Sequence, residues 1–515
     1  MKYGIVVSGL IVLCSSGYAH VKDERALFPL TEESLRQSNV VYGVTFSTNY
    51  LSQQVYPGTQ RTLHVYVPAQ YDGKTPAGLC VMLDGIGFGM PVVLSNLIEA
   101  KAVPVMIVVG VPPGRVPGVS DADSARANRT YEYDTASPRF GSFLIQEIMP
   151  FLATLSTPDG RKLLLSPQGN DRMIAGGSSG AACAYNVAWF YPEVFPRVFS
   201  AIGSYTGLRG SFIHPTLLHK TEPQPLRLYL QSGENDMWTS FGDWWSANNA
   251  MVRALTYAGY DYAFKFGEGK HSGVHGEQLL PEAMRFLWKG YPAPIVASTT
   301  SRNHFLKQIV VEGEGFRPSS EPFPEEPFRL KEIDGSPVLG HALLRSGNAY
   351  VSTEKALFHL MANGDREPLE TGFKGATALA VDASGQWLYL FERDTRRGYS
   401  YQIGTDEKLR YKQEFFYIHQ PDECDGAETL GAVCDRDGRT YLATAMGVQV
   451  CDYNGRSAAI LPLPQHEKAI ALAFGGEARN LLYVKSASGK IYSRKLSVTG
   501  DSVKEPPAKI RIGAG

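Results

Sequence analysis

Ser178 stands at the centre of a Gly-x-Ser-x-Gly pentapeptide, Gly176 to Gly180. The preceding "RMIA" is typical of a short buried strand, and the following "GAACAYNVAWF" is typical of a helix. Between a strand and a helix, such a pentapeptide forms a sharp turn that exposes a nucleophilic hydroxyl. The pattern therefore predicts Ser178 as a nucleophile. Ser179 is the alternative, because a frame shifted by one residue also fits.

A serine nucleophile needs a general base and an acid that orients the base, and after this type of turn the chain order is Ser, Asp or Glu, His. Asp236 follows the strand-like "LRLYLQ" and is the predicted acid, with Glu234 and Asp243 as nearby substitutes. His271 follows the strand-like "DYAFKFG" and is the predicted base. His275 competes with it for this role.

His271 and His275 also have the His-x-x-x-His spacing that some zinc sites use. The segment predicts no helix and offers no obvious third ligand, so we expect no metal there. A serine mechanism through an acyl-enzyme needs no cofactor.

The oxyanion that forms during acyl transfer needs amide donors. By the pattern of such turns, one donor is the amide of Ser179, the residue after the nucleophile. The other comes from an early strand-to-helix loop, and "MLDGIGFGM" is the candidate, with Gly85 or Ile86 donating. The glycines of this loop do not match the dinucleotide-binding fingerprint.

Two further segments are candidates for the substrate cleft. The run "ANRTYEYDT" supplies Arg129, Glu132 and Tyr133, with a salt-bridged structural loop as the equal alternative. The run "DMWTSFGDWW" places Trp238 and Trp244 beside the predicted acid. Aromatic rings there would suit a sugar or a phenolic ring, and core packing is the alternative.

These residues need a scaffold, and residues 40–290 predict one. Short apolar strands alternate with longer amphipathic segments: "LCVMLDG" (79–85) and "VPVMIVVGV" (103–111) predict buried parallel strands, and residues 141–155 have helical spacing. The segment "TLHVYVPAQY" predicts an antiparallel edge strand. This alternation predicts an α/β sheet with helices on both faces.

The pattern changes after residue 292. Residues 293–327, rich in Pro, Ser and Glu, predict a linker with a strand-like "LKQIVVEG" inside it. Beyond it, a turn glycine shortly before an aromatic strand recurs four times, and the tyrosines are 39, 52 and 42 residues apart: Tyr350, Tyr389, Tyr441 and Tyr483. Repeats of roughly 40–50 residues predict β-propeller blades.

The first 19 residues have a basic start, an apolar run and small residues ending at Ala19. They predict a secretory signal, and hence export to a periplasm or secretion. No later apolar run is long enough to span a membrane. The net charge of −1 gives no basic field for nucleic acid. Cys14 falls in the signal, which leaves an odd number of cysteines, with Cys434 and Cys451 as the candidates for one disulfide.

With these residues in view, the N-terminal part resembles the enterochelin esterase and esterase D-like group of α/β-hydrolases, which overlaps with feruloyl and acetyl-xylan esterases. The resemblance includes "VMLDG", "NRTYEYDT", "GGSSGAACAYNVAWFYPEVF", "SGENDMW" and "YAGYDYAFKFGEGKHSGVHG". It implies the roles given above for Ser178, Asp236 and His271, and an ester substrate that carries a sugar or an aromatic group.

The C-terminal part resembles the gluconolactonase and regucalcin-like propeller family, most clearly across residues 410–495. Active members bind a divalent metal through acidic and amide side chains. Those positions fall on Leu339, Thr377 and Leu430, none of which is a useful ligand. Without its Lewis acid a lactonase loses its chemistry, so the resemblance implies a degenerate, non-catalytic domain.

We therefore expect a signal peptide (1–19), an α/β-hydrolase esterase domain (20–292), a linker (293–327) and a degenerate gluconolactonase-like β-propeller domain (328–515). The predicted function is that of an exported serine esterase acting on small-molecule or polysaccharide esters of the acetyl or feruloyl type. One alternative is a siderophore (enterochelin-type) esterase, which the neutral charge balance supports little. Another is a carbohydrate-binding protein with a vestigial hydrolase domain, against which the complete Ser, Asp and His set argues. A metal-dependent lactonase ranks last.

Overall fold

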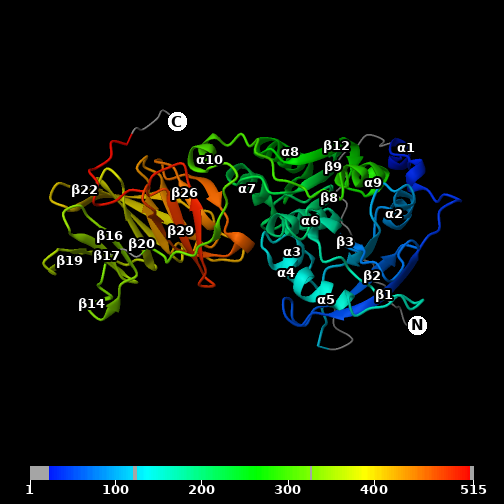
Figure 1. Ribbon diagram of the computed structural model, residues 1–515, viewed down its shortest axis with the longest axis horizontal. Coiled ribbons are helices and arrows are strands. Elements are labelled where there is room, and N and C mark those ends of the chain that lie inside the picture. The colour runs from blue at the N-terminus through cyan, green and yellow to red at the C-terminus, as the bar shows by residue number, and fades with distance from the viewer. Residues whose placement is uncertain (1–22, 120–124, 325–327, 511–515) are drawn as a thin grey trace, which may run out of the picture.

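A computed structural model describes residues 23–119, 125–324 and 328–510, and Figure 1 shows two domains side by side. The expected signal, residues 1–19, lies outside the described residues. None of the helices in the described ranges is long and apolar enough to cross a membrane.

The first domain is built on one ten-stranded sheet. Its strands are β1 Val44–Leu51, β2 Gln60–Val67, β3 Gly78–Leu83, β4 Met106–Val111, β5 Arg115–Val116, β6 Arg126–Ala127, β7 Arg172–Gly177, β8 Arg197–Ala201, β9 Arg227–Asn235 and β12 Asp261–Lys270. The order is β12-β9-β8-β7-β3-β4-β2-β5-β6, with β1 paired to β2. Strands β4, β3, β7, β8, β9 and β12 pair in parallel. The predicted parallel strands are confirmed. The predicted antiparallel strand, β2, lies inside the sheet between β1 and β4 and is not its edge.

Helices cover this sheet on both faces. They are α1 Glu24–Leu27, α2 Met90–Glu99, α3 Arg129–Tyr133, α4 Arg139–Phe143, α5 Met149–Leu152, α6 Ser179–Phe190, α7 His214–Lys220, α8 Trp244–Ala258 and α9 Val274–Leu287. A π-helical turn, Leu144–Ile148, joins α4 to α5, so the helix predicted over 141–155 is present with one irregular turn. Single 3-10 turns lie at Glu32–Ser34, Gly169–Asp171 and Ser211–Ile213, and a short hairpin pairs β10 Trp238–Thr239 with β11 Gly242–Asp243.

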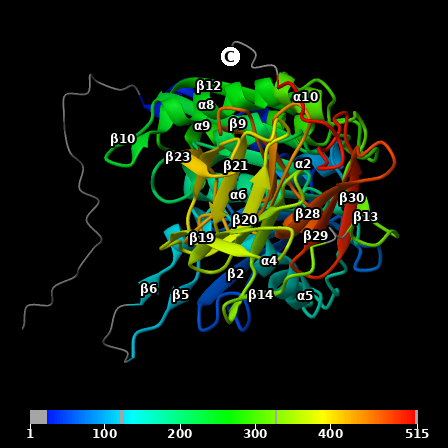
Figure 2. The same cartoon turned by 90° about the vertical axis from the view of Figure 1, so that its left-hand side faces the viewer.

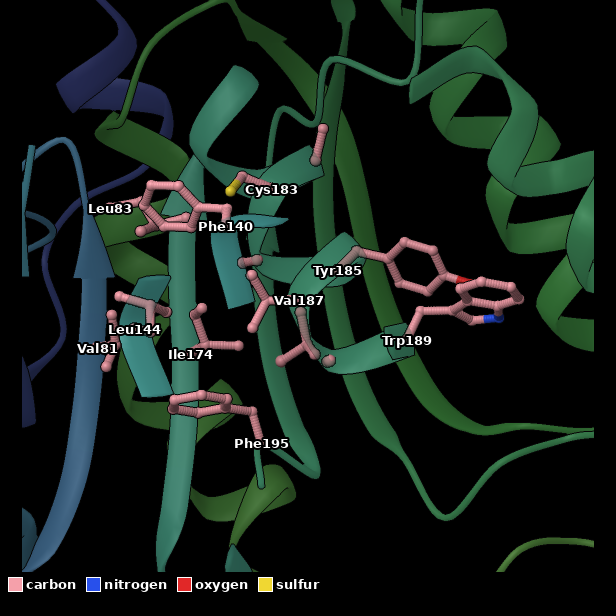
Figure 3. Close-up of a cluster of buried hydrophobic side chains, with 14 of the residues drawn as sticks. Val81, Leu83, Phe140, Leu144, Ile174, Cys183, Tyr185, Val187, Trp189 and Phe195 are labelled. Carbon is pink, nitrogen blue, oxygen red and sulfur yellow. The ribbon is translucent and has the colours of Figure 1, made fainter. Parts of the chain in front are cut away.

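Strand β3 shows why its sequence is apolar throughout. Val81 and Leu83 enter a core with α4, α6 and α8, whereas Cys80 and Met82 enter a second core with α2 and α9 on the opposite face. Figure 3 shows part of the first core, with Ile174 of β7 among the side chains between the sheet and α6. Successive strand residues point to opposite faces, so a strand covered on both sides is buried at every position.

The second domain consists of four four-stranded antiparallel sheets, which face the viewer in Figure 2. The sheets are β16 Gly340–Leu343, β17 Ala349–Ser352, β18 Ala356–Leu360 and β19 Arg366–Thr371; β20 Ala376–Val381, β21 Trp387–Glu392, β22 Arg397–Ile403 and β23 Leu409–Tyr417; β24 Gly431–Cys434, β25 Thr440–Thr444, β26 Gly447–Cys451 and β27 Ser457–Leu461; and β28 Ala469–Gly475, β29 Leu481–Ser486 and β30 Ile491–Lys495 with β13 Arg317–Pro318. A 3-10 turn, Pro464–His466, and a two-strand hairpin, β14 Glu332–Ile333 with β15 Ser336–Pro337, complete the domain.

The four repeated tyrosines occupy equivalent strands. Tyr350, Tyr389, Tyr441 and Tyr483 lie on β17, β21, β25 and β29, each of which is the second strand in one of the four consecutive runs β16–β19, β20–β23, β24–β27 and β28–β30. The predicted propeller-like architecture is therefore confirmed.

Part of the expected linker packs into the second domain. The segment expected as a strand, "LKQIVVEG", is instead helix α10 His304–Ile309, whose Asn303 caps it by accepting from the amide of Leu306 at 3.0 Å. Leu306 and Ile309 are buried in the propeller core. β13, also from this segment, pairs with β30 as the outermost strand of the last sheet. A short apolar run of this length fits a strand or a helix, and here the cap selects the helix.

Charged pairs join the two domains. Arg494 of β30 forms a bidentate pair with Glu222, at 2.6 and 2.8 Å, and Arg209 pairs with Asp422 at 3.0 Å. Lys220 donates to the carbonyl of Ser457 at 2.5 Å. The five cysteines after the expected signal are free, so Cys434 and Cys451 do not pair. They lie on β24 and β26, with β25 between them.

Candidate active site

Ser178 follows the last residue of β7 and precedes the first residue of α6. Its backbone has φ +57° and ψ −126°, a region that side-chain-bearing residues rarely adopt. A Cβ at Gly176 would lie 2.4 Å from the carbonyl of Gly180, and one at Gly180 would lie 3.0 Å from the carboxylate of Asp84. A backbone clash therefore requires glycine at position 176, and a side chain at position 180 would displace the carboxylate of Asp84. This turn places Ser178 at the carboxyl end of the sheet.

Ser178, Asp236 and His271 each come directly after a parallel strand: β7 ends at residue 177, β9 at 235 and β12 at 270. Because the carboxyl ends of parallel strands share one edge of the sheet, the three side chains meet. The Ser178 hydroxyl lies 2.9 Å from Nε2 of His271, and Nδ1 of His271 lies 2.5 Å from Oδ1 of Asp236. That oxygen also accepts from the amide of Met237 at 2.7 Å.

These contacts define the proton positions. A carboxylate can only accept, so Nδ1 of His271 carries the hydrogen, and Nε2 is left to accept from the Ser178 hydroxyl. The Asp236 side chain is fully buried and the His271 side chain is 19% exposed, so the base can reach a bound substrate.

Ser204 and Trp244 complete the surroundings of the nucleophile. The hydroxyl of Ser204 lies 3.0 Å from the Ser178 hydroxyl and accepts from the indole N–H of Trp244 at 2.9 Å. The Trp244 ring also packs edge-on against His271, with ring centroids 5.7 Å apart. No motif marks Ser204 in the sequence, and only the close return of the chain after β8 brings it here.

Trp244 is 1% exposed, so the expectation that it forms a substrate platform is wrong. It begins α8 and packs inward, and it contacts the site from within the fold. Trp238, on the β10–β11 hairpin that follows Asp236, is 83% exposed. It is therefore available to a substrate.

The loop after β3 borders the site and has a strained start. Asp84 has φ +65° and Gly85 has φ +106°. A Cβ at Gly110 of β4 would lie 2.7 Å from the amide nitrogen of Ile86, so glycine there allows the loop to pack closely. With residues 273, 274 and 277, this loop lines a cavity of about 430 Å³, a size suited to a small organic ligand.

Arg129 holds this loop to the nucleophile turn. Its Nε and Nη2 donate to the two carboxylate oxygens of Asp84 at 2.8 and 2.7 Å, and its Nη1 donates to the hydroxyl of Ser179 at 2.9 Å. The carboxylate of Asp84 raises the pKa of Arg129 against the effect of burial, which lowers it. The guanidinium thus binds a protein carboxylate and is not free for a substrate carboxylate.

Glu132 and Tyr133 are buried, which contradicts their expected place in a substrate cleft. Glu132 pairs with Arg61 at 2.9 and 3.1 Å, and both side chains are fully buried. The Tyr133 hydroxyl donates to the carbonyl of Val111 at 2.6 Å and accepts from the amide of Asp84 at 3.1 Å. The structural alternative is therefore correct for both residues.

Asp134 is a second buried carboxylate beside the site. Burial raises its pKa to about 6, although the hydroxyl of Ser179 and the charge of Arg129 pull in the opposite direction. A substantial fraction of Asp134 is therefore protonated in mildly acidic solution.

The alternatives to the three central residues lie elsewhere. The hydroxyl of Ser179 faces Arg129, and His275 stacks on Phe28 with its Nδ1 3.2 Å from the side-chain amide of Gln231. Asp243 caps α8, and Glu234 is exposed on β9. Within the described ranges, no group of three or more His, Cys, Asp and Glu residues could hold a metal ion, at the two histidines or elsewhere.

The propeller contains a cavity of about 660 Å³ lined by β16, β20, β24 and β28. Leu339, Thr377 and Leu430 lie in its wall, and the hydroxyl of Thr377 donates to the carbonyl of Thr429 at 2.5 Å. Two alkyl side chains and an occupied hydroxyl do not fit the oxygen-rich ligand set of a divalent cation.

Two family models match the chain. A model described as "Putative esterase" matches residues 54–289, and one described as "SMP-30/Gluconolactonase/LRE-like region" matches residues 334–488. The chain thus combines an esterase-family region with a gluconolactonase-like region. No curated protein matches the chain.

Solved structures similar to the chain fall in the same two groups. The enterobactin esterase of Shigella flexneri is 18% identical, with a TM-score of 0.37, over 49% of this chain and 61% of its own. The ferulic acid esterase of Anaeromyces mucronatus is 16% identical, with a TM-score of 0.35, over 49% of this chain and 93% of its own. A putative gluconolactonase is 18% identical, with a TM-score of 0.29, over 33% of this chain and 63% of its own. The chain spans less than two thirds of the first and the last of these.

Proposed function

We propose, from a chain that joins an esterase-family region to a gluconolactonase-like propeller, that the first domain is an exported serine esterase. One observation carries the proposal: the continuous hydrogen-bond chain from the Ser178 hydroxyl through His271 to Asp236. A nucleophile, a base and an orienting acid in this order are the parts that ester hydrolysis through an acyl-enzyme requires.

In this proposal, Ser178 attacks the ester carbonyl while Nε2 of His271 takes its proton and then delivers it to the leaving alcohol. Asp236 holds the tautomer and stabilises the imidazolium that forms. Because the Ser178 hydroxyl donates to His271, the Ser204 hydroxyl is the donor in its contact with the Ser178 oxygen. Water then attacks the acyl-enzyme, again with His271 as the base, and releases the acid.

The negative charge that develops on the carbonyl oxygen needs donors, and we assign them to the amide of Ser179 and to that of Gly85 or Ile86. Ser179 is the first residue of α6, where backbone N–H groups have no partner within the helix. The loop that carries Gly85 and Ile86 lines the 430 Å³ cavity, which has room for an acyl or aromatic group.

The charges beside the cavity favour a neutral ester. Arg129 pairs with Asp84, and Arg25 pairs with Glu277. A polyanionic siderophore would need free cationic groups, so a carbohydrate-linked acetyl or feruloyl ester is the better candidate. Trp238, which is exposed beside Asp236, offers a ring on which a sugar or a phenolic group can stack.

The deciding experiment is hydrolysis of p-nitrophenyl acetate and methyl ferulate by residues 20–515, with Ser178→Ala and excess EDTA. We expect EDTA to leave the rate unchanged and Ser178→Ala to reduce kcat by at least about 10³-fold. Ser179→Ala is the matched variant, since it keeps the backbone amide and should retain most of the rate. A full rate in Ser178→Ala would reject the assignment, and a rate lost to EDTA would favour a metal-dependent enzyme.

A further inference from the structure

The first described helix, α1, and the residue after it, Phe28, contact the end of the strand that leads to the candidate base. β12 lies at the edge of the ten-stranded sheet and pairs only with β9 within it. Figure 1 shows α1 at the same end of the domain as α9, the helix that follows His271. The backbone of a residue that follows an edge strand has a neighbouring strand on one side only, so a second element is needed to hold it from the other side.

Three side chains of this segment contact the chain on both sides of His271. The Glu24 carboxylate accepts from the backbone amide of Lys270, the residue directly before His271, at 2.7 Å. The ring of Phe28 stacks on His275, four residues after it, with centroids 3.9 Å apart and an angle of 14°. Arg25 pairs with Glu277, which lines the 430 Å³ cavity.

Phe28 also lies beside the glycines of the strand end. A Cβ at Gly267 or Gly269 would lie in ordinary van der Waals contact with the ring of Phe28, with nearest distances of 3.5 and 3.4 Å. The ring therefore lies beside the strand where β12 becomes irregular, between residues 267 and 270.

We propose that the segment Glu24–Phe28 is a positioning element for the general base. It fixes the backbone before His271 through Glu24 and the backbone after it through Phe28, so that Nε2 stays within hydrogen-bond distance of Ser178. The proposal rests on the function proposed above, but its structural part does not depend on turnover. A displacement of a catalytic group by about 1 Å can lower the rate about 10²-fold, so an element that holds the backbone at His271 affects kcat.

Four variants separate positioning from general stability. Glu24→Ala removes the acceptor for Lys270, whereas Glu24→Gln keeps a carbonyl oxygen that can still accept. Phe28→Ala removes the stacking ring, whereas Phe28→Tyr keeps it. Ala26→Ser, exposed on the same helix, is the control.

We expect Glu24→Ala, which removes a hydrogen bond, and Phe28→Ala, which removes a ring stack, to lower kcat on p-nitrophenyl acetate about tenfold each with little change in KM, a loss of about 1.4 kcal/mol of transition-state stabilisation. The Gln and Tyr variants should recover most of the rate. Hydrogen exchange should become faster across residues 267–275 in the two Ala variants and stay unchanged in the others.

Unchanged exchange across 267–275 in both Ala variants would overturn the brace itself. Faster exchange with a wild-type kcat would overturn its role in positioning His271. A wild-type protein that hydrolyses no ester would refute the proposed esterase. In that case the far-downfield N–H proton of the His271–Asp236 pair, followed by NMR, takes the place of kcat, and its retention in both Ala variants would overturn the positioning role.

Discussion

The pair of Arg129 and Asp84 allows a test of how the oxyanion loop is held. Asp84 takes a left-handed backbone conformation, which costs a residue with a side chain about 1–2 kcal/mol. The bidentate pair with Arg129 opposes this cost. The Arg129 side chain is 38% exposed and the Asp84 side chain is 35% exposed, so the pair is only partly shielded from solvent. Exposed pairs contribute up to about 1 kcal/mol, and the bidentate geometry places this one at the upper end.

The two energies are similar, so losing the pair should release the loop in a large fraction of molecules. We expect Arg129→Ala to lower kcat about fivefold, since about 1 kcal/mol corresponds to a factor of about five in rate. The upper limit is the loss of one oxyanion donor, about 10²–10³-fold. Arg129→Lys keeps the charge but not the fork that matches a carboxylate, so an intermediate loss is expected.

The assay is steady-state hydrolysis of p-nitrophenyl acetate by Arg129→Ala, Asp84→Ala and the double variant. If the pair acts by holding the loop, kcat falls and the double variant is little worse than either single one. If Arg129 binds substrate, as the sequence first indicated, KM rises while kcat stays unchanged. A kcat within about a factor of two of wild type in the folded single variants would refute the loop argument.

Three further predictions concern stability. The native pKa of Asp134, about 6, lies above its unfolded value, so its contribution to the free energy of unfolding falls as pH rises through the range between the two values; Asp134→Asn should remove the part of this loss that falls between pH 5 and pH 8, about 1.4 kcal/mol, when urea unfolding at these two pH values is compared with wild type. Glu132→Gln should leave Arg61 buried without a charged partner and lower the free energy of unfolding, measured in urea, by about 3–5 kcal/mol. A change near zero would show that the pair is not needed for stability. Leu306→Ala should lower the free energy of unfolding of the propeller by about 2–5 kcal/mol and lower its melting temperature. An unchanged melting temperature would show that Leu306 belongs to the linker and not to the propeller core.

The sequence predicts the catalytic scaffold well because its signals are local. The turn at Ser178 needs glycines within two residues, and Asp236 and His271 each follow a recognisable strand. Parallel pairing then brings strand ends together without any further information. The tyrosine repeat is local in the same sense, because each blade repeats one strand–turn pattern.

The residues that the sequence misplaced depend on partners far along the chain. Glu132 is buried because Arg61, 71 residues earlier, pairs with it, and no local pattern announces this partner. Trp244 is a candidate aromatic platform by its place beside the predicted acid, but it starts a helix that packs inward, in agreement with the core-packing alternative. Ser204 and Phe28 were missed for the same reason, since each reaches the site only through tertiary packing.

The propeller lacks a usable metal-ligand set at the expected positions, but its contacts with the rest of the chain give it a structural role. Its last sheet takes its outermost strand, β13, from the segment before the first sheet, which covers an edge that would otherwise expose unpaired backbone. The neighbouring strand β30 carries Arg494, whose side chain is 3% exposed and pairs with Glu222 of the first domain. Separating the domains would leave this cation without its partner and expose Leu218 and Ile460, both fully buried in a core shared by the two domains. The propeller and the esterase-like domain therefore stabilise each other whether or not the propeller binds a ligand of its own.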